Sequence, residues 1–249
     1  MGAKRDFNVK AINTEVAAAM LSMQEHWLPQ SNLDLLLPPV DVGVFFCYQN
    51  PIISGILQIF WSFGSMVNVL KISLAETLVS YYAFAGELVQ NIAGEPEIHC
   101  NNAGVDFTEV WADVELKEIS FYNPDESIEG KLVPKKQHGV LAVQVTELKC
   151  GGVVVACTFD HRVADAYSAN MFLVSWAVLA QSKPISQLPS FRRSFLFPRR
   201  PSYYDPSIDS MYLPISALKQ ETTNNIDHDD QVISKIYYVK AEEINRLNH

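Results

Sequence analysis

Cysteines and long apolar runs are both scarce in this sequence. The four cysteines form no C-x-x-C pair and none has the spacing of a His/Cys metal site, so we expect reduced thiols and no bound metal. The longest apolar stretch, Ile52 to Phe63, is shorter than the ~20 residues that a membrane-spanning helix needs. Met1 to Val16 has no apolar run after its basic residues and does not resemble a secretory signal. These absences predict a cytoplasmic protein that does not enter a membrane.

An excess of positive charge and a phosphate-binding loop are missing as well. Lys and Arg number 19 against 28 Asp and Glu, and the formal net charge of −9 makes nucleic acid an unexpected partner. Gly151-Gly152 lacks the residues that complete a P-loop, and no G-x-S-x-G nucleophile elbow occurs. Glycine and proline, 11 and 13 of 249 residues, are too few for a disordered chain. We therefore expect a folded chain with a buried core.

The clearest local pattern is a β-hairpin. Residues 140–148 alternate between apolar and polar side chains, and residues 153–159 are almost wholly apolar. Lys149-Cys150-Gly151-Gly152 lies between them and is typical of a hairpin turn. Because the second strand is apolar on both faces, we expect it to lie in the interior of a sheet.

Further strands and helices are predicted on both sides of the hairpin. Strand patterns cover residues 40–48 and, more weakly, 105–114. Apolar residues at three- and four-residue steps predict one helix over 64–85, ended by Gly86, and another over 166–181. The apolar stripe of the second helix is expected to be Tyr167, Met171, Val174 and Val178. This mixture of strands and helices favours an α/β sandwich with a mixed sheet.

The amino-acid composition of the sequence changes after residue 181. Prolines punctuate the next segment, which ends in a polar stretch, so residues 182–231 are predicted to form a crossover or linker. Residues 232–239 are again strand-like, and the helix pattern that starts at Ala241 is cut off. We expect residues 1–181 to form one domain and residues 232–249 to be the truncated start of another.

His161 and Asp165 are the pair of residues best placed to perform chemistry. They lie between the strand over 153–159 and the helix over 166–181, where α/β folds commonly carry functional groups. A neutral imidazole there can take a proton from an alcohol or amine near neutral pH, whereas the alternative is a partly buried structural histidine. Asp165 can either orient the ring or turn away and hold the loop. The spacing does not decide between these alternatives.

Strand geometry excludes a nucleophilic Cys–His pair. Cys157 and His161 share one face of the strand, but four residues of regular strand separate them by ~13 Å. Asp160 is expected to face the opposite side. His161 is therefore the candidate that we retain.

Several sequence blocks resemble, in the same order, motifs of the plant BAHD acyl-CoA-dependent acyltransferases. Phe159-Asp-His-Arg-Val-Ala-Asp165 resembles the HxxxD region of that family, and Ser31-Asn-Leu-Asp34 resembles its early S-x-L-D block. Leu70 to Gly86 is similar to its LK-x-SL…YYPLAG helix, and Leu188 to Pro201 to its P-x-x-DR…R-x-P crossover. Together the blocks cover most of the chain up to about Pro214.

This resemblance implies a fold similar to that of chloramphenicol acetyltransferase, a two-layer sandwich of which this chain would hold one of two related domains. It implies that His161 is the general base that deprotonates an acceptor hydroxyl, and that the alkoxide attacks the thioester of acyl-CoA directly. Asp165 would be mainly structural, turned away from the histidine and paired with an arginine. Acyl-CoA would be a co-substrate, with no permanently bound cofactor.

Departures from the family pattern bear on the acceptor. Asp160 and Ala166 stand where members often have a histidine and a glycine. Asp41 and Phe46, both substrate-pocket candidates, fall near places where shikimate- and quinate-using members often carry histidine and tyrosine, which counts against those acceptors. Residues 159–177 look most similar to coniferyl-alcohol acyltransferase-like members. We therefore expect acetyl transfer to a phenylpropenyl alcohol of plant secondary metabolism.

A second interpretation follows from a motif that the sequence lacks. The family's D-F-G-W-G block does not occur, so the chain can also be interpreted as a non-catalytic, truncated half-protein that binds an acceptor or a homologue. Such a half should associate through an apolar face, whereas the full-length family enzyme is expected to be monomeric. A condensation-type domain of peptide synthesis shares an HHxxxDG motif, but the blocks at Ser31 and Leu70 argue against it.

Overall fold

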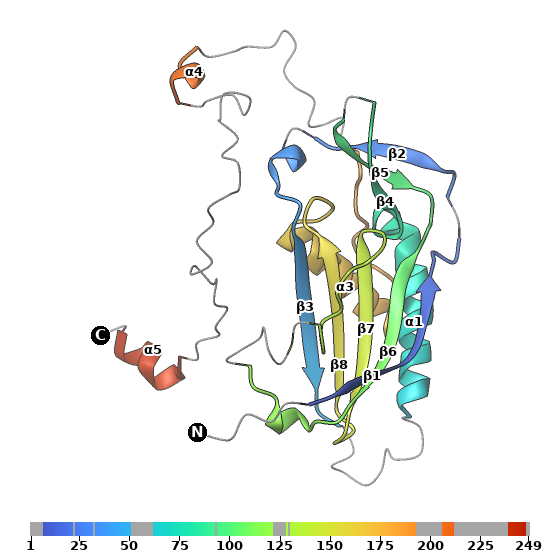
Figure 1. Cartoon of the computed structure of the whole chain (residues 1–249), viewed down its shortest axis with the longest axis vertical. Helices are drawn as coiled ribbons and strands as arrows, with labels where there is room; N and C mark the ends of the chain where they lie inside the picture. The colour runs from blue at the N-terminus through green and yellow to red at the C-terminus, as the bar shows by residue number, and fades with distance from the viewer. Residues whose placement is uncertain are drawn as a thin grey trace, which may run out of the picture. The chain divides into compact units, whose positions relative to one another are not determined.

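A mixed β-sheet is the centre of the fold. A computed structural model of the chain describes residues 7–21, 23–31, 33–50, 62–92, 94–121, 128, 130–192, 206–211 and 239–247. The main sheet has the strand order β1-β6-β7-β8-β3 (Figure 1). These strands are β1 (Val9–Ala17), β6 (Val105–Ala112), β7 (Leu141–Leu148), β8 (Val153–Asp160) and β3 (Asp41–Tyr48). Neighbouring strands are antiparallel except β6 and β7, which are parallel.

The predicted hairpin is the pair β7–β8. The N–H of Leu148 donates to the carbonyl of Gly152 over 2.8 Å, and the N–H of Gly151 donates to the carbonyl of Leu148 over 2.7 Å. Gly151 has φ +75°, a left-handed conformation that favours glycine at this turn. Strand β8 lies between β7 and β3, so the prediction of an interior strand is confirmed.

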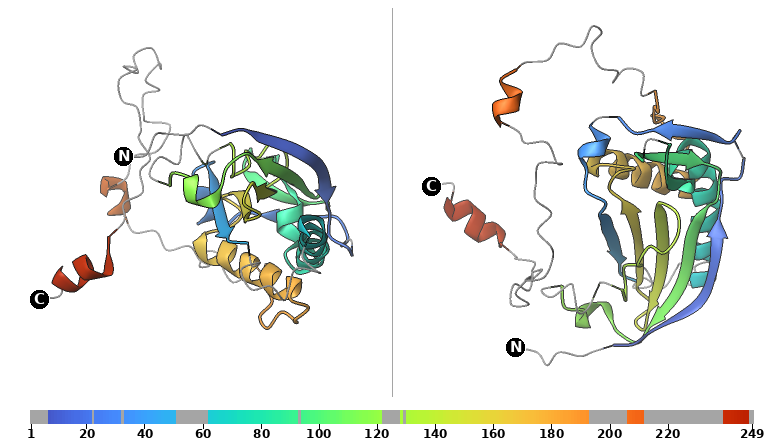
Figure 2. Two further views of the ribbon diagram at one scale, coloured as in Figure 1. Left: turned by 90° about the horizontal axis from the view of Figure 1, so that it is seen from below. Right: turned by 45° about the horizontal axis from the view of Figure 1, so that its top comes forward.

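Two helices cover one face of this sheet. Helices α1 (Phe63–Ser80) and α3 (Ala166–Ala180) pack against each other on the same side of the strands (Figure 2). The indole N–H of Trp176 joins them by donating to the carbonyl of Leu70 and to Oγ of Ser73, each over 3.0 Å. The core between the helices and the sheet includes Leu74, Leu78, Phe107, Leu141, Val143, Phe159 and Phe172.

The first helix ends earlier than the sequence pattern predicts. It begins at the N-cap Ser62, whose Oγ accepts from the N–H of Ser65, and ends at Ser80 rather than at residue 85. Tyr81 leaves the helical conformation because its ring is buried and its hydroxyl lies 2.9 Å from Oγ of Ser175. A separate 3-10 turn, η2 (Tyr82–Ala85), follows.

The buried face of α3 is not the predicted one. Tyr167 and Val174, two members of the expected stripe, are 67% and 51% exposed. The residues that α3 buries are instead Ala169, Phe172, Ser175 and Trp176. The helix is apolar on both sides, and the face that it buries carries two large aromatic rings, which contact Tyr81, Phe84 and the carbonyl of Leu70.

The other face of the sheet is covered by a segment that includes residue 128 and residues 130–136. Its Leu132 and Val133 pack with Val154 and Ala156 of β8. Farther along the strand, Oγ1 of Thr158 donates to the carbonyl of Pro134 over 2.6 Å. The even-numbered residues of β8 therefore face this segment, and the odd-numbered ones face the helices.

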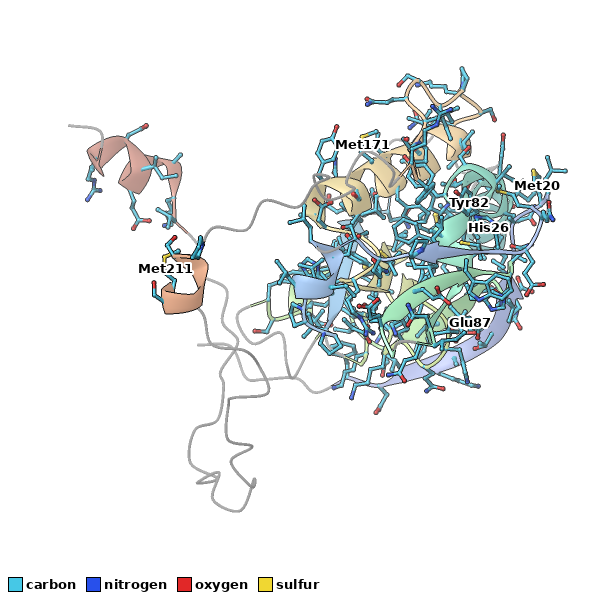
Figure 3. The ribbon with its side chains drawn as sticks, turned by 90° about the horizontal axis from the view of Figure 1, so that it is seen from above. Met20, His26, Tyr82, Glu87, Met171 and Met211 are labelled. Atoms are coloured by element: carbon cyan, nitrogen blue, oxygen red, sulfur yellow. The ribbon has the colours of Figure 1, made fainter. Side chains whose placement is uncertain are left out.

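Three short strands form a second, smaller sheet, and one of them directly follows η2 in the chain. Its strand order is β2-β5-β4, with β2 (His26–Pro29), β5 (Pro96–Cys100) and β4 (Glu87–Gln90) all paired antiparallel. The rings of His26 and Tyr82 lie together with centroids 5.2 Å apart, which joins β2 to η2 (Figure 3). Short elements complete the described chain, namely η1 (Asp34–Leu36), η3 (Leu116–Glu118), α4 (Ile208–Met211) and α5 (Ala241–Leu247).

The chain divides into two compact units, residues 1–190 with 235–249, and residues 191–234. The predicted helix after Ala241 is present as α5, but most of the predicted crossover and nearly all of the strand over 232–239 lie outside the described residues. The domain division at residues 181 and 231 stays a prediction. No helix in the described ranges is long and apolar enough to cross a membrane.

Candidate active site

His161 directly follows the end of β8. Its backbone N–H donates to the carbonyl of Val40 over 3.0 Å, and the N–H of Asp160 donates to the carbonyl of Val140 over 2.9 Å. The N–H of Val163 then donates to the carbonyl of Asp160 over 3.0 Å and closes a turn. The backbone that carries His161 is therefore tied to segments on both sides of β8.

The imidazole of His161 is only partly buried, but its Nδ1 is enclosed. This nitrogen has no hydrogen-bond partner in the part of the chain that the structure describes. Neither Asp160 nor Asp165 orients the ring through Nδ1 as the aspartate of a Ser-His-Asp triad does. Among the described residues, no hydrogen bond to Nδ1 therefore fixes the direction of the ring.

Asp165 is the N-cap of α3. Its Oδ1 accepts a hydrogen bond from the backbone N–H of Ser168 over 2.7 Å, which satisfies one of the free donors at the start of the helix. This bond and the Ser168 side chain hold the pKa of the Asp165 carboxyl below its usual range. Within the described ranges Asp165 has no ion pair with an arginine. Asp165 therefore caps the helix that follows His161, and its structural role in the motif stays a prediction.

Removing this cap should destabilise the protein modestly. We expect Asp165→Ala to lower the free energy of unfolding at pH 7 by about 1 kcal/mol, measured by urea denaturation. Asp165→Asn, which can still cap the helix, should stay close to wild type. Because folding lowers the pKa, the stabilisation by Asp165 exists above the unfolded pKa and disappears as the pH falls through the folded one. Equal stability of the alanine variant and wild type at pH 7 would contradict this role.

Asp160 and Arg162, the residues before and after His161, form an ion pair. Asp160 has a side chain only 6% exposed. Its Oδ1 accepts from the backbone N–H of Arg162 over 3.0 Å and from Nε over 2.9 Å, and its Oδ2 accepts from Nη2 over 2.8 Å. Burial alone would raise the pKa of Asp160, but the bonds and charge of Arg162, with the charge of Lys136, outweigh it and hold the pKa low.

Of the two substrate-pocket candidates, one lies near this pair. Asp41 is directly opposite Asp160 in the β3–β8 ladder, and its Oδ1 lies 3.2 Å from Nζ of Lys136. Phe46, on the same strand, lies opposite Val155, five residues farther along and ~17 Å away by strand rise. The structure therefore brings Asp41 to the end of the sheet where His161 lies and places Phe46 away from it.

The described residues support neither a cysteine nucleophile nor a metal centre at this site. Cys157 is buried on β8, and burial raises the pKa of its thiol to about 12, so it stays protonated. Among the described residues no three His, Cys, Asp or Glu side chains gather in a way that could hold a metal ion. The partners that sequence reasoning missed are Arg162 and Lys136. The only feature of the sequence that could have indicated the role of Arg162 is that this cation lies two residues from an aspartate. No feature of the sequence indicates the role of Lys136.

The sequence matches the model of the Transferase family over residues 7–249. A hydroxycinnamoyltransferase of Narcissus pseudonarcissus is 33% identical over 178 residues, which are 69% of this chain and 39% of that protein. Hydroxycinnamoyltransferase 1 of Oryza sativa subsp. japonica is 30% identical over 87% of this chain and 51% of its own length. Deacetylvindoline O-acetyltransferase of Catharanthus roseus is 32% identical over 64% of this chain and 34% of its own length. The chain thus spans about half or less of these relatives.

Solved structures with a similar fold include vinorine synthase, with a TM-score of 0.60 and 24% identity over 74% of this chain and 46% of that one. A second is F. graminearum TRI101 complexed with coenzyme A and T-2 mycotoxin, with a TM-score of 0.53 and 10% identity over 74% of this chain and 47% of that one. These likenesses show the expected α/β fold, similar to that of chloramphenicol acetyltransferase. The family model and the relatives confirm the family that the sequence blocks indicate: the chain belongs to the Transferase family, the BAHD acyl-CoA-dependent acyltransferases.

Proposed function

We propose that His161 is the general base of an acyltransferase that moves an acyl group from acyl-CoA to the hydroxyl of a small plant metabolite. The observation that carries this proposal is the placement of His161 in the turn between β8 and α3, with its backbone fixed to Val40 and its Nδ1 enclosed. Because Nδ1 is closed off, the nitrogen that would meet an acceptor is Nε2. The family match supports the reaction class.

The reaction needs one proton carrier. Nε2 takes the proton of the acceptor hydroxyl, and the resulting alkoxide attacks the carbonyl carbon of the thioester. The carbon–sulfur bond then breaks, the ester is released, and the CoA thiolate recovers the proton from the imidazolium. His161 returns to its neutral form, and no acyl-enzyme is required. Cys157, with its raised thiol pKa, is unsuited to carry an acyl group.

The substrates that we propose are acetyl-CoA and a phenylpropenyl alcohol, on the basis of the residues 159–177 block. Relatives carry names with both acetyl and hydroxycinnamoyl groups, and with alcohol and amine acceptors such as a fatty alcohol and putrescine. A hydroxycinnamoyl-CoA is therefore the competing donor, and an amine the competing acceptor.

A substrate panel tests this function. The purified chain is incubated with acetyl-CoA or a hydroxycinnamoyl-CoA and with a phenylpropenyl alcohol, a fatty alcohol or putrescine, and release of the CoA thiol is followed. We expect acceptor-dependent release that is fastest with acetyl-CoA and the phenylpropenyl alcohol. Release at the rate without protein for every combination would contradict catalysis by this chain. It would favour the half-protein that binds an acceptor or a homologue.

A further inference from the structure

Asp160 and Arg162 lie on either side of His161 in the sequence and bind each other across it. Three hydrogen bonds of 2.8 to 3.0 Å join the Asp160 carboxylate to Arg162, two from its guanidinium and one from its backbone N–H. The Arg162 side chain is 25% exposed and that of Asp160 only 6%. A fork of this kind is more directional than a single charge contact.

The carboxylate of Asp160 completes the bonding of the turn. The N–H groups of residues 160, 161 and 163 donate to the carbonyls of Val140, Val40 and Asp160. The N–H of Arg162 is the one donor in this run that has no carbonyl, and it donates to Oδ1 of Asp160. Every N–H from residue 160 to residue 163 is thus satisfied, and the one next to His161 depends on a side chain.

The surrounding charges explain why this carboxylate needs Arg162. Asp41 lies directly opposite Asp160, and like charges in directly opposed cross-strand positions repel. Lys136 pairs with Asp41 at 3.2 Å, while Arg162 pairs with Asp160. Two cations therefore balance two carboxylates at this end of the sheet. A nearly buried Asp160 that lost the Arg162 guanidinium would lose most of the compensation of its charge.

We propose that Asp160 is a positioning residue whose carboxylate, with Arg162, clamps the backbone on both sides of His161 and thereby sets the direction of the imidazole. The proposal rests on the proposed role of His161 as the base. It follows from the absence, among the described residues, of any hydrogen bond to Nδ1, because the ring then takes its direction from the turn. A displacement of about 1 Å at a reacting group can lower the rate by about a hundredfold.

The first test is Asp160→Asn, which keeps the shape of the side chain, removes its charge and replaces the oxygen that accepts from Nη2 of Arg162 with an amide NH₂ group that cannot accept. We expect kcat to fall by about tenfold to a hundredfold while KM for acyl-CoA stays near the wild-type value. The matched control is Asp113→Asn, because Asp113 pairs with Lys149 at 3.5 Å and is half exposed. A kcat of Asp160→Asn equal to that of the control would overturn the proposal.

A double variant separates positioning from stability. Arg162→Gln leaves the Asp160 carboxylate buried without the guanidinium, supported only by the backbone N–H of residue 162 and the charge of Lys136, so its Tm should fall below that of Asp160→Asn. The double variant Asp160→Asn/Arg162→Gln carries neither charge, so it should regain Tm relative to Arg162→Gln. Its kcat should stay low if the clamp positions His161. Recovery of kcat together with Tm would show that the pair only stabilises the protein, and would overturn the proposal.

A spectroscopic readout keeps this test independent of turnover. With ¹³C-labelled histidine, the His161 Cε1–H signal is assigned as the one that His161→Ala removes. We expect Asp160→Asn to shift or broaden this signal and Asp113→Asn to leave it unchanged. An unchanged signal in Asp160→Asn would overturn the clamp even if His161 is the base. Conversely, wild-type turnover by His161→Ala would refute the proposed function, while the signal would still report whether Asp160 fixes the ring.

Discussion

Replacing His161 with alanine is expected to lower kcat by roughly 10²–10⁴-fold, the range that a positioned general base usually contributes. Without the imidazole, no group in the turn can take the proton of the acceptor as its oxygen attacks the thioester. Asp160 is held by Arg162, and Asp165 is bound to the start of α3, so neither can replace it. KM for acyl-CoA should change little, because the base acts on the acceptor. Steady-state release of the CoA thiol measures both constants.

His138→Ala is the matched control for this prediction. His138 is an exposed histidine whose Nδ1 lies 3.4 Å from Oδ2 of Asp106, before the start of β7 and outside the proposed site. We expect this variant to keep the wild-type kcat. If His161→Ala lost no more activity than His138→Ala, the proton would be taken by another group, and the base assigned to His161 would be wrong.

The second large effect is expected in the core. Phe172→Ala should lower the free energy of unfolding by about 3–5 kcal/mol, because it leaves a cavity where a fully buried ring had packed. The ring of Phe172 stacks on Phe84 with centroids 4.5 Å apart and meets Tyr81 edge-on at 5.5 Å. Since domains are stable by only about 5–15 kcal/mol, this variant should unfold at a much lower urea concentration.

Val174→Ala tests the same helix from its other side. Val174 is half exposed on α3, so its truncation should change the stability by no more than about 0.5 kcal/mol. Urea denaturation of both variants decides which face of α3 is buried in solution. A larger loss for Val174→Ala than for Phe172→Ala would restore the stripe that the sequence pattern predicts and contradict the packing described above.

The β7–β8 hairpin and the helix positions are predictable from local patterns. Alternation in β7, the apolar run of β8 and the Lys149-Cys150-Gly151-Gly152 turn between them all predict the same hairpin. The strands β1, β2, β4 and β5 are not predictable in this way. Strand β1 is largely exposed along its length and β4 has four residues, so neither carries a periodic apolar signal.

The two errors within helices have specific causes. Periodicity cannot choose a face of α3 because apolar residues occupy both sides, and the choice depends on α1 and η2, which receive Phe172 and Trp176. The end of α1 is set by burial of Tyr81, a tertiary effect. Gly86 does not end that helix; a Cβ there would lie 2.6 Å from the carbonyl oxygen of His99, so glycine is needed for close packing.

In the candidate site, too, some features are predictable from the sequence and others depend on tertiary structure. The position of His161 at the end of a strand is readable from the sequence, whereas the spacing left open whether Asp165 orients the ring or holds the loop. The Asp160–Arg162 clamp is not readable, because residues two apart contact each other only when the strand ends in a turn. Phe46 was placed near the site by resemblance, whereas its register opposite Val155 depends on the pairing of β3 with β8.

Counting both products of the reaction tests the role of His161 most directly. The wild-type chain and His161→Ala are incubated with acetyl-CoA and a phenylpropenyl alcohol, and the CoA thiol and the ester are quantified in the same samples. For wild type we expect one ester for each CoA released and no release without the alcohol. For His161→Ala we expect neither product at more than about a hundredth of the wild-type rate. Ester formation by His161→Ala at the wild-type rate would contradict direct transfer with His161 as the base.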